Sequence, residues 1–101
     1  MLHRKLKAKD GQAEAFTKIL LETSAIVSSM KGCRFYIVSR DQTDRNAIWV
    51  TELWNSKQEH DQSLQDGRVK SLISRGIPLL DGPPQGGQEL EVLGGMEHLP
   101  K

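Results

Sequence analysis

The sequence predicts an α+β fold with the element order β-α-β-β-α-β, a ferredoxin-like plait in which one antiparallel sheet carries both helices on the same face. Three observations predict it: an alternating strand pattern opens the chain, a long amphipathic pattern follows, and two strand patterns joined by a polar turn precede a second helical pattern. A chain of 101 residues is long enough for one domain and not for two, so we expect a single domain over residues 1–101.

The first strand is predicted over residues 2–9. Leu2, Leu6 and Ala8 alternate with His and Lys side chains, which is the period of a half-buried strand. Arg4 is the one exception on the apolar side. An Asp-Gly pair then ends the strand.

A long amphipathic helix is predicted over residues 12–30. Apolar side chains recur there at helical spacing, so one face of the helix should pack on the sheet. Lys31-Gly32 ends the helix, because Gly suits the left-handed cap. The residues that define this face are Phe16, Ile19, Leu20, Thr23, Val27 and Met30.

Residues 33–39 and 47–54 are predicted to form an antiparallel hairpin. Both segments are rich in β-branched and aromatic residues, and the polar turn 41–46 between them is short. Both faces of the second strand carry large apolar groups. One face should therefore pack against the helices of the same chain, and the other should pack against another surface. One face holds Ile48, Val50, Glu52 and Trp54, and the other holds Ala47, Trp49, Thr51 and Leu53.

A capped helix should follow the hairpin. Ser56 and Glu59 form the S-x-x-E capping box, in which the side chains satisfy free N–H groups of the first turn. An Asp-Gly pair weakens this helix, and a second helical piece is expected over 69–73. The Gly- and Pro-rich segment 76–88 predicts a loop, and residues 90–93 predict a short last strand.

Composition excludes several classes of function. The 14 Lys and Arg nearly cancel the 13 Asp and Glu, so we expect no nucleic-acid partner and no acidic membrane partner. No apolar run is long enough to span a membrane, and the basic start lacks the apolar core of a signal peptide. Cys33 stands alone, which favours a reducing cytoplasm. His3, His98 and the other His lack metal-ligand spacings, so no metal site is expected.

The segment TELWNSKQEH, residues 51–60, resembles the E-x-W-x-S-x-x-x-H pattern of the antibiotic biosynthesis monooxygenase family. This family includes small quinol monooxygenases and haem-degrading enzymes. The resemblance covers nearly the whole chain, including Gly32-Cys33 and the Gly- and Pro-rich loop. The family fold is a dimeric α+β barrel, which agrees with the predicted plait and implies a homodimer that packs sheet against sheet.

The resemblance implies an oxidation without metal, flavin or other cofactor. The substrate, an electron-rich phenol or quinol, would itself reduce oxygen, while the protein takes a proton from it and stabilises the anion in a dry pocket. The candidate catalytic residues are His60, Tyr36 and Trp54. The candidate substrate-binding residues are Phe16, Leu20, Trp49, Glu52 and Leu64.

The sequence departs from the family pattern in the second helix. Many members carry a His three residues beyond the position of His60, where this chain has Ser63. The haem-degrading branch has a Trp there and a His ten residues later, where this chain has Ile73. Haem degradation is therefore disfavoured, and catalysis by a His of this helix would rest on His60.

Each candidate also has a structural alternative. Trp54 fits a core aromatic at a strand end, and Glu52 would then form a salt bridge with Arg34 or Arg4. His60 fits a half-exposed surface residue of a first helical turn.

Three hypotheses for the function remain. The first is a cofactor-independent monooxygenase acting on a small aromatic quinol or polyphenol. The second is a non-catalytic dimeric module that binds a small apolar ligand, which Ser63 favours. The third is an isomerase or lyase on the same fold. The sequence does not identify the substrate or the sheet face that lines the pocket.

Overall fold

The computed structural model describes residues 1–83 and 86–96, and the expected element order is confirmed. His98 lies outside the described residues. The elements are β1 (Leu2–Lys7), α1 (Ala13–Val27), β2 (Cys33–Arg40), β3 (Ala47–Trp54), α2 (Lys57–Ser63), α3 (Gly67–Gly76), the 3-10 helix η1 (Ile77–Leu79) and β4 (Gln88–Glu89).

The four strands form one antiparallel sheet in the order β2-β3-β1-β4, which is the strand order of the ferredoxin-like plait. The predicted hairpin of β2 and β3 is therefore confirmed. Glu52 of β3 lies opposite Leu2 on β1 and opposite Tyr36 on β2. Because residues directly opposite in an antiparallel pair point to the same face, these side chains share one side of the sheet.

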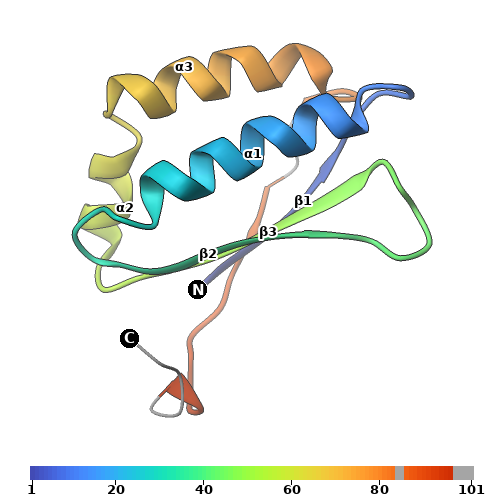
Figure 1. Ribbon diagram of the computed structural model, residues 1–101. Helices are drawn as coiled ribbons and strands as arrows, with labels where there is room; N and C mark the ends of the chain where they lie inside the picture. The colour runs from blue at the N-terminus through green and yellow to red at the C-terminus, as the bar shows by residue number, and fades with distance from the viewer. Residues whose placement is uncertain (84–85, 97–101) are drawn as a thin grey trace.

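The helices α1 and α3 lie side by side across one face of the sheet, and α2 lies at one end of it (Figure 1). The core forms between this layer and the sheet. Ile48 and Val50 of β3 pack with Phe16 and Leu20 of α1, and all four are buried. None of the helices in the described part of the chain is long and apolar enough to cross a membrane.

The first helix is shorter than the sequence pattern predicts. It ends at Val27, and a turn with a backbone hydrogen bond from Met30 to the Val27 carbonyl follows. Gly32 has the positive φ of 87° expected of it, but it shapes the entry to β2 and does not cap the helix. The Gly32 carbonyl accepts a 2.7 Å hydrogen bond from Asn55 N, so the end of β3 holds this turn in place.

The end of the chain also differs from the prediction. The expected loop contains η1, and the last strand is Gln88–Glu89 rather than residues 90–93. It pairs only with the first two residues of β1. Leu90 still bonds to the Met1 carbonyl at 2.7 Å, but β1 offers no further partner, so the following residues leave the sheet. Leu93 is 90% exposed.

No helix of the described residues lies on the other face of the sheet (Figure 1). His3 stacks on Trp49 there with ring centroids 4.6 Å apart, and His3 Nδ1 lies 2.9 Å from Thr51 Oγ1. Ile37, which lies opposite Thr51, is 51% exposed. The expectation that both faces of β3 carry large apolar groups is confirmed, and one of those faces is open in the single chain.

Candidate functional site

An apolar cavity of about 190 Å³ lies between the sheet and the three helices. Buried side chains of α1 form one wall and those of α3 form the other. A cavity of about 150 Å³ in another protein core binds benzene, so this space suits one aromatic ring. Six of the sequence candidates line it: Phe16, Leu20, Tyr36, Glu52, His60 and Leu64.

Four of the polar side chains that line the cavity come from four different elements. Arg4 belongs to β1, Glu52 to β3, Tyr36 to β2 and His60 to α2. Tyr36 lies directly opposite Glu52, while Arg4 lies opposite Val50 and is thus the diagonal neighbour of Glu52 on the same face. The strand register therefore brings a cation, a carboxylate and a phenol together beside an apolar cavity.

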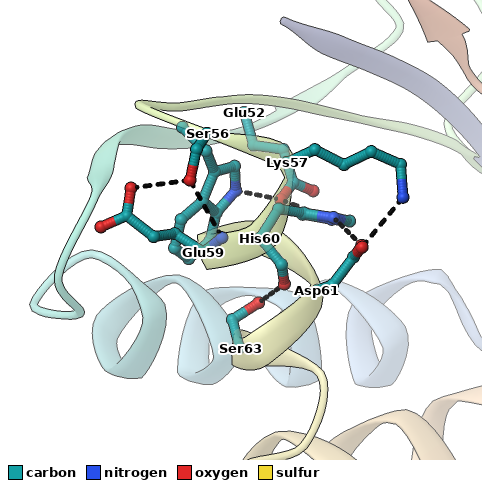
Figure 2. Close-up of polar contacts among 8 residues, drawn as sticks. Glu52, Ser56, Lys57, Glu59, His60, Asp61 and Ser63 are labelled. Carbon is teal, nitrogen blue, oxygen red and sulfur yellow. Dashed lines mark hydrogen bonds and ion pairs between the residues drawn. The ribbon is translucent and has the colours of Figure 1, made fainter.

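Glu52 is held by two groups that sequence reasoning did not pair with it. Trp54 Nε1 donates a 2.7 Å hydrogen bond to Glu52 Oε1, and His60 Nε2 lies 3.4 Å from the same oxygen (Figure 2). The side chains of Glu52 and His60 are only 15% and 19% exposed. The Trp54 and His60 rings meet edge to face with centroids 5.8 Å apart.

The expected salt bridge between Glu52 and an arginine is wrong within the described residues. Arg34 extends from the exposed side of β2, where Nη1 donates to Asn55 Oδ1 at 3.5 Å. Arg4 lies near Glu52 without pairing to it. The donors of β3 itself and of α2 satisfy the carboxylate instead, because they lie on the same face at the end of the strand.

The orientation of His60 depends on the start of α2. Ser56 Oγ accepts a 3.2 Å hydrogen bond from Glu59 N, so the N-cap half of the predicted capping box is confirmed, while Glu59 Oε1 accepts a 3.0 Å bond from the Ser56 hydroxyl (Figure 2). The Glu59 carboxylate packs so closely on Gly32 that a Cβ there would clash with it. The turn before β2 therefore helps to fix the first turn of α2.

Asp61 holds the outer edge of the His60 ring. Its Oδ1 lies 3.3 Å from His60 Nδ1, and its Oδ2 accepts a 2.9 Å hydrogen bond from Lys57 Nζ (Figure 2). Each ring nitrogen of His60 thus faces a carboxylate, Nδ1 on the solvent side and Nε2 on the cavity side.

Burial chiefly, and also the negative charge of Glu52, raise the pKa of Tyr36 well above its usual value. Tyr36 therefore keeps its proton at neutral pH and acts as an O–H donor. Among the described residues none accepts a hydrogen bond from this hydroxyl, although Tyr36 lines the cavity. The hydroxyl can therefore donate to a bound ligand.

The two tryptophans lie outside the apolar cavity. Trp54 lines a more open and more polar cavity of about 420 Å³, which shares Arg4, Glu52 and His60 with the first. These three residues mark the boundary between the two spaces. Trp49 lies on the helix-free face of the sheet, apart from the other candidates.

The two positions at which the sequence departs from the family pattern both line the apolar cavity. Ser63 is buried, and its Oγ donates a 2.5 Å hydrogen bond to the His60 carbonyl. Ile73 of α3 contributes an apolar surface that is 42% exposed. Within residues 1–83 and 86–96, no three His, Cys, Asp or Glu side chains gather closely enough to hold a metal ion.

The sequence singled out Arg4 as an exception in the strand alternation and as a possible partner of Glu52, but not as a residue of the site. That exception was the available signal, because a charged residue at an inward position of a strand either needs a partner or serves a site. The sequence could not show which cavity the position faces.

The chain is similar in sequence to a known protein family. Residues 1–74 match the family model described as "Antibiotic biosynthesis monooxygenase". Among curated proteins, none matches the chain significantly.

Among solved structures, a protein from Chloroflexus aurantiacus that is assigned to the antibiotic biosynthesis monooxygenases is 38% identical, with a TM-score of 0.82 over 93% of this chain and 92% of that one. Rv0793 from Mycobacterium tuberculosis is 15% identical, with a TM-score of 0.82 over 93% of this chain and 94% of that one. PA3566 from Pseudomonas aeruginosa is 23% identical, with a TM-score of 0.73 over 86% and 84%. The last two share the fold alone.

Proposed function

Because this chain belongs to the antibiotic biosynthesis monooxygenase family, we propose that it is a monooxygenase that oxidises a single-ring quinol with molecular oxygen and without a bound metal or flavin. The observation that carries the proposal is the cavity: it is large enough to hold one aromatic ring, and it has apolar walls with a base and an O–H donor at its polar side. Residues 1–101 would form one domain of this kind.

The proposed reaction balances without an external reductant. A quinol and O2 give a hydroxyquinone and water, so one oxygen atom enters the ring and the other leaves as water. The substrate supplies all the electrons. The protein must remove a phenolic proton, because the phenolate gives an electron to O2 far more readily than the phenol does, and it must keep water away from the intermediates.

We assign the proton transfer to His60. The proposal assigns the ring proton to Nδ1, which would donate to Asp61 at 3.3 Å, so that Nε2 would accept the phenolic proton on the cavity side. Glu52 Oε1, at 3.4 Å from Nε2, would stabilise the imidazolium that forms. Trp54 holds that carboxylate through its 2.7 Å hydrogen bond, so it acts as a positioning residue in this proposal.

Tyr36 would stabilise the negative charge that forms when the substrate loses its proton. Its protonated hydroxyl, without a partner among the described residues, would donate to the substrate oxyanion. Phe16, Leu20 and Leu64 would hold the ring and exclude water.

We further propose a homodimer formed through the helix-free face of the sheet. Trp49, Ile37 and Leu53 lie on that face, and burying it would remove a large apolar area from water. The exposed segment that ends near Leu93 would reach across to the partner. The single Cys33 fits a reducing compartment, so a cytoplasmic location is part of the proposal.

Ser63 supports a second candidate, a ligand-binding module without catalysis. At the position where many relatives carry a His, this chain has a hydroxyl that is occupied with the His60 carbonyl. A module of this kind would bind the same single-ring aromatics and leave them unchanged.

The test is oxygen uptake by purified protein, freed of metals by a chelator, with hydroquinone and its methyl-substituted forms. The proposal expects one O2 consumed for each quinol and a product heavier by 14 Da, which is the gain of one oxygen and loss of two hydrogens; with 18O2 the gain is 16 Da. Saturable binding of these quinols without oxygen uptake above the protein-free rate would favour the binding module.

A further inference from the structure

Arg4 is a cation on the inner face of the sheet with no assigned task. Its neighbours along β1 on that face are Leu2 and Leu6, and it lines both the apolar cavity and the polar cavity beside it. Within the described residues no carboxylate lies within ion-pairing distance of its guanidinium. Arg4 is exposed, so its guanidinium can be reached by a ligand that enters either cavity.

The backbone before β4 restricts where the Arg4 side chain can lie. A Cβ at Gly87 would come within 3.3 Å of both Cβ and Nε of Arg4, so the chain at residue 87 packs directly on the arginine stem. β4 brings it there by pairing with Leu2 and His3. The stem thus lies between the sheet and residue 87, and the guanidinium end is left at the boundary of the two cavities.

The charges around Arg4 point to an anion that it would bind. Glu52 is the nearest candidate partner on the sheet, but its Oε1 is occupied by Trp54 Nε1–H and faces His60 Nε2. The positive charge of Arg4 still acts on the Tyr36 hydroxyl, where it opposes the effects of burial and of Glu52. Arg4 and Tyr36 also both line the apolar cavity, with Glu52 between them in the strand register, so one small ligand there can contact both.

We propose that Arg4 is a specificity-determining residue that binds a carboxylate on the substrate ring, so that the substrate class is a hydroxylated benzoic acid with the acid group beside the reacting hydroxyl. The claim that such acids are oxidised rests on the proposed function. The claim that Arg4 binds their carboxylate does not. The planar guanidinium matches a carboxylate with two parallel hydrogen bonds, which a phenol or an amide cannot accept in the same way. Placing the acid group next to the hydroxyl follows from the diagonal arrangement of Arg4 and Glu52, with Tyr36 opposite Glu52.

The binding test uses two unreactive probes of nearly equal shape, salicylate and salicylamide, measured by titration calorimetry at neutral pH. Wild-type protein should bind salicylate about tenfold or more tightly than salicylamide, which is the range of a charge-assisted hydrogen bond. Arg4→Met should abolish that preference and leave salicylamide binding unchanged. Arg4→Lys should retain only part of it, because Lys keeps the charge and loses the planar fork.

Lys5→Met is the matched control, because it removes the same charge from the next residue of the same strand, on the face away from the cavities. It should keep the full preference. Equal binding of acid and amide by wild type, no binding of either probe at millimolar concentration, or a preference that survives Arg4→Met would each overturn the proposal.

Oxygen uptake separates this inference from the proposed function. With 2,5-dihydroxybenzoate and its amide as substrates, the acid should have the lower KM in wild type and not in Arg4→Met. Selective binding of salicylate with no oxygen uptake on any quinol would reject the monooxygenase and keep the carboxylate site. Oxygen uptake on neutral quinols with no preference for the acid would reject the carboxylate site and keep the monooxygenase.

Discussion

Trp54 Nε1 donates a 2.7 Å hydrogen bond to Glu52 Oε1, so two side chains of one strand, two residues apart, are joined at the polar side of the cavity. Neighbours at this spacing share a face of the sheet. The bond gives the carboxylate an N–H partner, whereas no arginine in the described part of the chain pairs with it. The E-x-W part of the sequence pattern thus has a physical meaning, because the tryptophan fixes the glutamate beside His60.

Trp54→Phe should lower the free energy of unfolding by about 1.5–3 kcal/mol, the range for a hydrogen bond to a charged group in a partly buried site. Urea denaturation measures the change. In a Glu52→Gln background the same substitution should cost less, because the acceptor no longer carries a charge. An equal cost in both backgrounds would show that the stabilisation comes from the tryptophan ring and not from its bond to the carboxylate.

His60→Gln should reduce the rate of quinol oxidation by about 10²–10⁴-fold, the usual loss for a positioned general base. Glutamine keeps the size and the helical tendency but removes the basic nitrogen. Initial rates of oxygen uptake at saturating quinol measure the effect. His3→Gln, on the opposite face of the sheet, is the control and should leave the rate close to that of wild type. Equal rates for the two variants would remove His60 from the mechanism.

Ser56→Ala should destabilise the protein by about 1 kcal/mol, because the first turn of α2 loses the oxygen that accepts from Glu59 N. Ser74→Ala is the control, since Ser74 is exposed within α3 and caps no helix. Thermal unfolding of both variants measures the difference. Equal melting temperatures for the two variants would contradict the capping role of Ser56.

Stability should depend on pH through Asp66, the N-cap of α3. Its carboxylate accepts from the Arg68 side chain and from the backbone N–H groups of Arg68 and Val69, which lower the pKa of Asp66 from 3.8 to about 2. Because the folded pKa lies below the unfolded one, the stabilisation is complete above pH 3.8 and is lost as the pH falls through about 2.

Asp66→Asn removes this titration and keeps an oxygen that can cap the helix. The difference in unfolding free energy between wild type and Asp66→Asn should therefore shrink between about pH 6 and about pH 2, as measured by urea denaturation at each pH. A difference that stays constant over that range would contradict the assignment.

The proposed dimer predicts that a charge placed at Ile37 separates the subunits. Ile37→Lys puts an ammonium group on the helix-free sheet face, where a partner sheet would bury it. Sedimentation equilibrium at micromolar concentration should give twice 11.3 kDa for wild type and 11.3 kDa for the variant. Leu21→Lys is the control, since Leu21 is similarly exposed on α1, and it should remain dimeric. A wild type that sediments at 11.3 kDa would exclude the dimer.

Local patterns were enough to predict the main elements and their order. The bounds of β3 and the helix N-cap at Ser56 are as predicted, because strand alternation and helix capping depend on residues within one or two turns of each other. The end of α1 and the position of β4 were not predictable in this way. β4 stops where β1 begins, and that limit is set by a strand almost ninety positions away in the sequence.

The sequence by itself determined which chemical groups the site can use: one histidine in a fixed helical turn, one tyrosine, and a glutamate two residues before a tryptophan on the same face. Only the tertiary structure decided which of these meet. The register of β1 and β2 against β3 places Arg4 and Tyr36 around Glu52, whereas the position of Trp49 on the opposite face already follows from the alternation along β3. Register is a relation between distant segments, and it is set by which hydrophobic faces are buried together, so no local pattern could contain it.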